Sequence, residues 1–441
     1  MRKFAKYLAP LLFAASTISL AHAEDVAIVG GTVHTMDGAA IENGVVIISG
    51  DTIEAVGGAD TAVPEGYRVI DATGKQVTPG LMSAFTQIGL EEVSLEGSTI
   101  DHSITNTFYT AGFEVAKGFN PDTPIIAINR IEGLTRAVIM PGFGVPFNQN
   151  NSKSIFPGQA GIIHLGGGND AVTSSQAAVV VYPGNGDVGG ARGAVMDYLT
   201  GALRESKPPA KKKRRSSSDA GSGGPGRFAK SPEDKAAFTK AVTGEIPLYI
   251  LEDKASKILQ LIALKEEFPD LDLVILSGAE AWVVAGDLAA ADVSVVITGT
   301  DNLPGSFDSL AATLYNAARL EDAGVNFAIV AGGFSSTHNA RLLPQDAGNA
   351  VAHGLSWQGA LEAITINPAR IFGIDDTVGS LTVGKEADVV VWDGDPLEVM
   401  TSPDHVFIRG EENPLVSRQT RLRERYIDLD AEKDKPLAYK K

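Results

Sequence analysis

Residues 78–89 read Thr-Pro-Gly-Leu-Met-Ser-Ala-Phe-Thr-Gln-Ile-Gly, and this short stretch decides the fold. The Pro-Gly pair near its start is typical of a turn. The apolar residues that follow predict a buried strand over Leu81–Ile88. Further apolar runs predict strands at Thr135–Met140, Pro247–Leu251, Leu273–Ser277, Val293–Gly299 and Phe327–Gly332.

Helical stretches separate several of these predicted strands. Apolar residues recur at helical spacing over Lys254–Phe268, Ser309–Ala323 and Trp357–Ile366. Alternating strands and helices predict a parallel sheet. Among parallel folds, a chain of 441 residues favours a TIM-like (β/α)₈ barrel over an open doubly wound sheet, although periodicity alone does not separate the two.

Both ends of the chain outside this pattern are rich in short β runs. Asn43-Gly44 and Gly50-Asp51 flank the apolar run Val45–Ile48, as in a tight hairpin. A similar pattern recurs near the C-terminus, at Ala387–Trp392. We therefore expect a small β-sandwich formed by residues 24–78 and 376–412, around a barrel over 79–375, with a charged tail over 413–441.

A basic insertion near residues 205–232 interrupts the predicted barrel. It contains Lys211-Lys212-Lys213-Arg214-Arg215 followed by serines and glycines. Such a run can serve as a nucleic-acid or localisation patch. The Ser/Gly/Pro-rich surroundings favour a disordered, solvated loop instead.

Residues 1–23 have the pattern of a secretory signal peptide. Arg2, Lys3 and Lys6 precede an apolar run, and Ala21-His22-Ala23 resembles a cleavage site. No later stretch is apolar enough to span a bilayer. We therefore expect an exported protein, in the periplasm or secreted, with no membrane span after signal cleavage.

Composition excludes several partners and chemistries. The chain has no cysteine, so disulfides, thiolate nucleophiles and thiolate zinc sites are excluded. The formal net charge is −17, which disfavours nucleic acid as a partner.

The chain resembles the amidohydrolase superfamily, in particular its imidazolonepropionase-like exported branch. Four segments carry the resemblance: Thr365–Gly373, Gly379–Trp392, Gly133–Val138 and the predicted first barrel strand within residues 78–89. It implies a barrel with a small sandwich. It also implies a metal-dependent hydrolase of C–N bonds, often in cyclic amides and in related branches in dipeptides, that uses zinc or another divalent ion.

The positions that carry metal ligands in that family hold other residues in this chain. The resemblance places them at Phe85, Gln87, Leu251 and Ser277. A phenyl or isobutyl group cannot bind a metal ion, and an amide oxygen is a poor zinc ligand. We therefore expect no bound metal and a degenerate metal site.

Other polar residues near the predicted strand ends are candidates for function. Glu252, Asp253 and Asp301 could hold a hard ion such as calcium or magnesium, or act as an acid/base pair. Alternatively Glu252, Asp253 and Glu280 stabilise helix N-termini. His338 is a further catalytic candidate, and the residues expected at the barrel mouth for substrate binding are Phe85, Gln87, Glu252 and Glu280.

Two functions follow from these expectations. The first is an exported hydrolase of non-peptide C–N bonds, weakly active or inactive because the usual ligands are replaced. The second is a non-catalytic protein that binds a small molecule, or that serves as a structural partner of an intact paralogue in a hetero-oligomer. A homo-oligomer is an alternative assembly.

Overall fold

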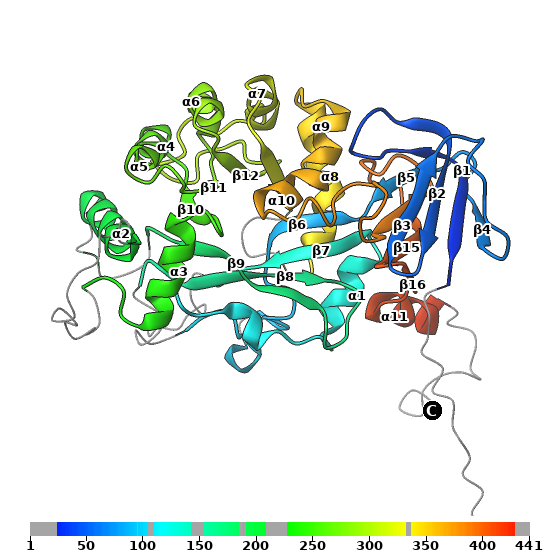
Figure 1. Cartoon of the computed structure of the whole chain (residues 1–441), viewed down its shortest axis with the longest axis horizontal. Helices are drawn as coiled ribbons and strands as arrows, with labels where there is room; N and C mark the ends of the chain where they lie inside the picture. The colour runs from blue at the N-terminus through cyan, green and yellow to red at the C-terminus, as the bar shows by residue number, and fades with distance from the viewer. Residues whose placement is uncertain are drawn as a thin grey trace, which may run out of the picture.

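The computed structural model describes residues 24–94, 96–104, 110–142, 154–184, 188, 191–208, 227–331 and 337–427. Two β structures dominate it, a barrel surrounded by helices and a separate sheet beside it (Figure 1). The predicted signal peptide, the centre of the basic insertion (209–226) and the end of the tail (428–441) lie outside the described residues.

Eight strands form the barrel. They are hydrogen-bonded in the order β13-β12-β11-β10-β9-β8-β7-β6. Their bounds are β6 (Leu81–Thr86), β7 (Leu134–Ile139), β8 (Gly158–His164), β9 (Val172–Val181), β10 (Leu248–Glu252), β11 (Leu273–Ser277), β12 (Ser294–Thr298) and β13 (Phe327–Val330). The predicted TIM-like fold is confirmed, and the six strands predicted from apolar runs are all present.

One barrel strand runs against the others. β8 pairs antiparallel with both β7 and β9, while the other neighbours pair parallel. The last gap, between β13 and β6, is bridged by the chain itself. The N–H of Ile329 donates to the carbonyl of Ala363 at 3.0 Å, and the N–H of Met82 donates to that of Ile364 at 2.8 Å. The barrel is therefore nearly closed.

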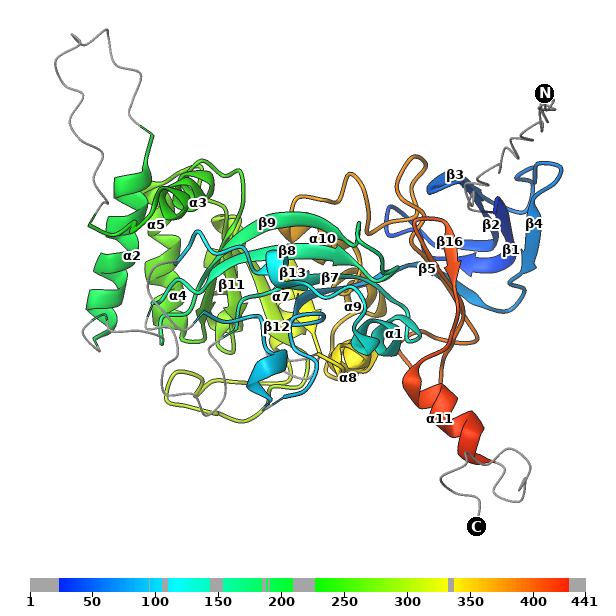
Figure 2. The ribbon, with the colours of Figure 1, turned by 90° about the horizontal axis from the view of Figure 1, so that it is seen from below.

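Helices cover the outside of the barrel (Figures 1 and 2). The α-helices are α1 (Pro124–Arg130), α2 (Arg192–Ser206), α3 (Pro232–Val242), α4 (Ala255–Ile262), α5 (Leu264–Glu267), α6 (Ala285–Ala290), α7 (Asn316–Asp322), α8 (Leu343–Ala352), α9 (Trp357–Glu362), α10 (Ile366–Ile371) and α11 (Arg418–Ile427). Short 3-10 helices are η1 (Gly97–Thr99), η2 (Val115–Gly118), η3 (Ala281–Val284) and η4 (Ala340–Leu342).

The helices are shorter than the apolar spacing predicted. The stretch 254–268 divides into α4 and α5, and within 309–323 only α7 is helical. Local capping explains where others begin. In α3, Ser231 and Asp234 form a reciprocal capping box, and Pro232 occupies the first turn. In α1, Thr123 accepts a hydrogen bond from the N–H of Ile125.

The second sheet joins both ends of the chain. Its order is β16-β15-β14-β5-β1-β2-β3, with β4 also paired to β1. The bounds are β1 (Val26–Val33), β2 (Ile41–Ser49), β3 (Thr52–Gly57), β4 (Arg68–Asp71), β5 (Gln76–Pro79), β14 (Val389–Trp392), β15 (Pro403–Ile408) and β16 (Glu411–Asn413). Pairing of β5 with β14 unites segments from opposite ends of the sequence.

This sheet curves around one apolar core. Val46 from β2, Val389 from β14 and Phe407 from β15 belong to the same buried cluster, although β2 is not adjacent to the other two strands. The N–H of Ile53 in β3 donates to the carbonyl of Lys385 at 2.9 Å, which joins the edge strand to the segment before β14. The two ends therefore fold together as predicted.

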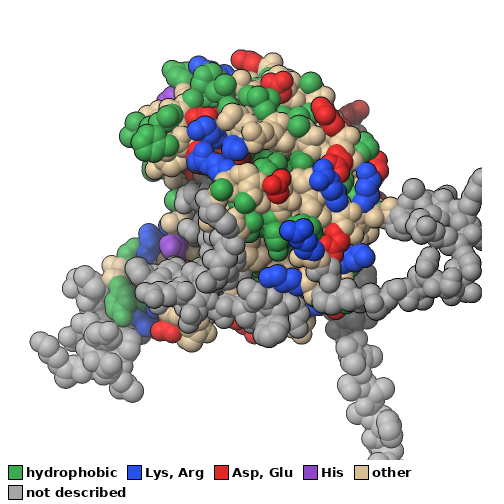
Figure 3. Space-filling view, turned by 90° about the vertical axis from the view of Figure 1, so that its left-hand side faces the viewer, with side chains coloured by type: hydrophobic (Ala, Val, Ile, Leu, Met, Phe, Trp, Pro, Cys, Tyr) green, Lys and Arg blue, Asp and Glu red, His purple; other side chains and the backbone are tan. Residues whose placement is uncertain are grey.

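The exterior of the described residues has mixed character. On the face next to α2, α4 and α5, basic and acidic side chains are interspersed with apolar ones (Figure 3). Within the part of the chain that the structure describes, no helix is both long and apolar enough to cross a membrane.

Candidate functional site

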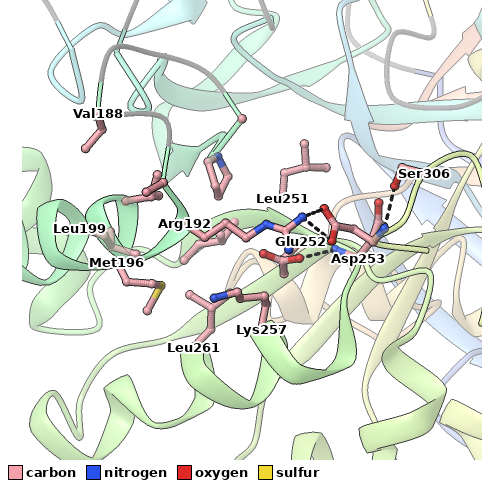
Figure 4. A pocket seen from close by; sticks show the side chains of 16 residues that line it. Val188, Arg192, Met196, Leu199, Leu251, Glu252, Asp253, Lys257, Leu261 and Ser306 are labelled. Carbon is pink, nitrogen blue, oxygen red and sulfur yellow. Dashed lines mark hydrogen bonds and ion pairs between the residues drawn. The ribbon is translucent and has the colours of Figure 1, made fainter. Parts of the chain in front are cut away.

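A pocket of about 350 Å³ lies where β10 ends, between α2 and α4. Barrel enzymes place their active sites at this carboxyl-terminal edge of the strands. Its apolar end includes Met196, Leu199 and Leu261, while Glu252 and Asp253 lie at the opposite end (Figure 4). The pocket therefore presents an apolar wall and an acidic end to the same space.

Glu252 and Asp253 are held by backbone hydrogen bonds. One oxygen of Glu252 accepts the N–H groups of Asp253 at 3.1 Å and Lys254 at 3.0 Å. Asp253 accepts the N–H of Ala279 at 3.2 Å. Burial raises the pKa of both carboxyl groups, and the negative charge of Asp308 adds to the increase. Both groups therefore retain protons to higher pH than exposed carboxylates do.

Cationic side chains offset part of this negative charge. Arg192, at the start of α2, reaches across the pocket and pairs with Asp308 at 2.6 Å (Figure 4). Lys254 lies 3.6 Å from the same carboxylate. Because Arg192 is largely exposed, water screens this ion pair.

Replacing Glu252 with glutamine is expected to stabilise the protein modestly at neutral pH. Burial raises the folded-state pKa above the unfolded one, so ionised Glu252 opposes folding above the raised pKa. As pH falls through the raised pKa toward the ordinary value of 4.5, the wild type recovers and the difference shrinks. Urea unfolding over this pH range measures the effect.

Glu65→Gln is the matched control, because Glu65 is exposed and lies outside the pocket. It should leave stability unchanged. Lower stability of Glu252→Gln at every pH would contradict the expected sign.

The other acidic candidates have different surroundings. Glu280 is buried and accepts the N–H of Ala255, at the start of α4, at 3.0 Å and that of Ala311 at 3.1 Å. Glu280 therefore stabilises a helix N-terminus, which is the alternative role that the sequence predicted for it. Asp301 is exposed, and its charge contributes to the raised pKa of Asp253.

The four positions expected to hold ligands have mostly apolar surroundings. Phe85 is 1% exposed and belongs to the apolar cluster inside the barrel, with Tyr249 and others. Leu251 packs against the same cluster and also lines the pocket. Ser277 ends β11 with a φ of 81°, an unusual backbone conformation for serine, and its hydroxyl hydrogen-bonds with Asp253.

A second polar group lies where β6 ends, and the sequence predicted its members Gln87 and His338 but not Glu91 or His102. Gln87 is buried directly after β6, and nearby Oε2 of Glu91 lies 3.0 Å from Nε2 of His102, with both side chains buried. The hydrogen bond with His102 is the main cause that lowers the pKa of Glu91. The exposed His338 adds a smaller electrostatic contribution in the same direction.

Spacing alone could not have found this pair. Eleven positions separate Glu91 from His102, and they meet because the chain reverses between them. Glu91 forms an antiparallel bridge with Ile100, and the N–H of Asp101 donates to the carbonyl of Leu90 at 2.8 Å. Among the described residues, no three His, Asp or Glu side chains are grouped so that they could hold a metal ion.

One family model is similar to the C-terminal part of the chain. The sequence model of the Amidohydrolase family matches residues 250–415. The matched residues make up less than half of the chain. They include β10 to β13, and thus the acidic end of the pocket.

Two curated relatives match short stretches of the chain. An amidohydrolase, tasK, from Hapsidospora irregularis is 38% identical over 72 residues, which are 16% of this chain and 7% of the relative. An imidazolonepropionase from Shewanella frigidimarina is 54% identical over 39 residues, which are 9% of this chain and 10% of the relative. The chain therefore spans a tenth or less of these curated relatives.

Solved structures share the amidohydrolase fold over nearly the full length. An amidohydrolase from Thermotoga maritima has a TM-score of 0.72 at 24% identity, covering 88% of this chain and 99% of its own. An adenosine deaminase from Xanthomonas campestris, with bound zinc, has a TM-score of 0.50 at 17% identity, covering 88% and 92%. At these identities the likeness concerns the fold alone.

Proposed function

We propose that this chain is an exported amidohydrolase-family protein that binds a small molecule at the barrel mouth without the metal centre of the family. The observation that carries this proposal is the burial of Phe85, at 1% exposure, in the apolar interior of the barrel. The phenyl group occupies the first expected ligand position and cannot donate electrons to a metal ion as imidazole does.

The remaining expected ligand positions support the same proposal. Gln87 offers a neutral amide, Leu251 an alkyl group and Ser277 a hydroxyl that already bonds Asp253. A divalent ion such as zinc needs several imidazole, thiolate or carboxylate donors in one place. This set of side chains does not fit the ion.

The pocket at the end of β10 is the proposed binding site. Its apolar wall and its few converging polar groups are typical of small-molecule sites. The pattern of residues 1–23 supports export to the periplasm or beyond.

A hydrolase is the second candidate, and a specific observation favours it. The pKa values of Glu252 and Asp253 are raised by burial, and they line the pocket from adjacent positions. Carboxyl groups with raised pKa values can transfer protons near neutral pH. In this case the pair would serve as acid and base for hydrolysis of a C–N bond without a metal.

Metal analysis of the purified protein tests the main proposal. We expect much less than one zinc, iron or manganese ion per chain, and no change in melting temperature when a chelator is added. Hydrolysis of cyclic amides and dipeptides, if measurable, should be unaffected by the chelator. One tightly bound ion per chain, or turnover that a chelator abolishes, would contradict it.

Thermal-shift measurements with the same cyclic amides and dipeptides test the pocket. Met196→Trp should abolish any stabilisation, because Met196 lines the pocket and a larger side chain fills it. Asp197→Trp is the matched control, since Asp197 is exposed on the same helix and does not line the pocket. Stabilisation retained in Met196→Trp as fully as in Asp197→Trp would show that the compounds bind elsewhere.

A further inference from the structure

A serine, a histidine and a glutamate are linked in series at the barrel mouth, apart from the pocket already described. The hydroxyl of Ser103 lies 2.7 Å from Nδ1 of His102, and Nε2 of His102 lies 3.0 Å from Oε2 of Glu91. A base that connects a hydroxyl to a buried carboxylate is the arrangement that activates a nucleophile in hydrolases without metals.

The chain holds these groups from several directions. The other oxygen of Glu91 accepts the hydroxyl of Ser94 at 2.5 Å, which leaves Oε2 directed at the imidazole. The carbonyl of His102 accepts the N–H of Gly142, just beyond β7, at 2.9 Å. His102 is 2% exposed and Glu91 is 7% exposed, while Ser103 is partly exposed. The serine therefore meets solvent and the other two groups are shielded from it.

An amide donor lies beside the imidazole. A methyl group added at the Cα of Gly142 would stand 2.1 Å from Nδ1 of His102 and 2.8 Å from Nε2 of Gln87. Both side chains therefore border the same point of the backbone. An amide N–H in this place can stabilise the negative oxygen that develops when a hydroxyl attacks a carbonyl group.

We propose that Ser103, His102 and Glu91 form a metal-independent site for hydrolysis of small esters or amides, with Gln87 as the oxyanion donor. This activity goes beyond the proposed binding function and does not depend on the pocket at β10. Ser103 and His102 act on the substrate, and Glu91 is a positioning residue that fixes the imidazole with its proton on Nε2.

The reaction proceeds in two balanced steps. Ser103 Oγ attacks the carbonyl carbon and gives its proton to His102 Nδ1. As the C–O or C–N bond breaks, the imidazolium returns this proton to the departing alkoxide or amine, which leaves an acyl group on Ser103. Water then attacks the acyl carbon, its proton passes through Nδ1, and Ser103 Oγ leaves with that proton.

A fluorophosphonate probe tests the site, because it phosphonylates activated serines irrespective of substrate. Mass spectrometry should place the label on Ser103, and labelling should be abolished in Ser103→Ala. In His102→Gln the rate should fall by at least about a hundredfold, as expected for loss of a general base. The internal control is Ser98, an exposed serine of the same loop that hydrogen-bonds Glu96.

Labelling of Ser103 no faster than of Ser98, or equal in the wild type and His102→Gln, would overturn the proposal. Glu91→Gln separates positioning from structure. It should lower the maximal labelling rate while leaving the half-saturating probe concentration unchanged, whereas a merely structural role would raise that concentration or unfold the protein. Metal content does not affect this readout, so it can fail independently of the proposed function.

Discussion

Arg136→Met is expected to lower the free energy of unfolding by about 3–5 kcal/mol. Arg136 lies on β7 and is buried, and its Nε donates to Asp388 at 2.7 Å while its guanidinium also pairs with Glu386. Asp388 is 4% exposed, so the variant leaves a carboxylate buried without its cation. Urea unfolding followed by circular dichroism measures the loss.

Arg204→Met is the matched control. Arg204 makes two hydrogen bonds to Glu267, at 2.6 and 2.7 Å, but the pair is exposed on the surface. Its loss should change stability little, because water screens exposed ion pairs. If both variants lost the same stability, burial would not be the cause of the Arg136 effect.

The double variant Arg136→Met, Asp388→Leu separates the cost of an unpaired buried carboxylate from the cost of losing the packing of Arg136. Removing both charges should recover much of the stability lost in the single variant, since the unpaired buried carboxylate is then absent. The N–H of Arg409, which donates to Asp388 at 2.9 Å, would lose its acceptor and limit the recovery. No recovery would indicate that Arg136 acts mainly through packing.

The contact between Arg136 and Asp388 shows how far the sequence could predict this fold. Apolar runs located six barrel strands because burial of Val, Ile and Leu is a local signal, as in β11. β8 escaped because Gly158 and Gly161 dilute its apolar run and the turn-forming Gly166 to Gly168 follow it. β9 escaped because Thr173 to Gln176 make its first half polar. Nothing local indicated that Arg136 would meet Asp388.

The two candidate sites also differ in how well the sequence could predict them, because one follows a strand directly and the other depends on tertiary structure. Glu252 and Asp253 were predicted because they directly follow an apolar strand, and the end of a barrel strand is where functional residues collect. Glu91 and His102 follow no strand directly. They come together through the reversal of the chain at η1 and through contact with Gly142, which depends on tertiary structure.

Gly142→Ala is expected to slow fluorophosphonate labelling of Ser103 by about a hundredfold. The added methyl group would stand 2.1 Å from Nδ1 of His102, closer than real contacts allow, so the ring must move. A displacement of about 1 Å is enough to cost this much in a catalytic arrangement. Overpacking should also lower the free energy of unfolding by about 1–3 kcal/mol.

Gly97→Ala provides the comparison for this variant. Gly97 lies in η1, within the same loop, and a methyl group there meets no heavy atom within 4 Å. Labelling and stability should both match the wild type. The contrary outcome is that Gly142→Ala loses stability while its Ser103 is still labelled at the wild-type rate. That result would show that the position of the His102 ring does not determine the reactivity of Ser103, and it would contradict activation of Ser103 by His102 and Glu91. If labelling fell in Gly142→Ala alone, the ring contact would be the cause, because both variants add the same methyl group to neighbouring parts of one barrel mouth.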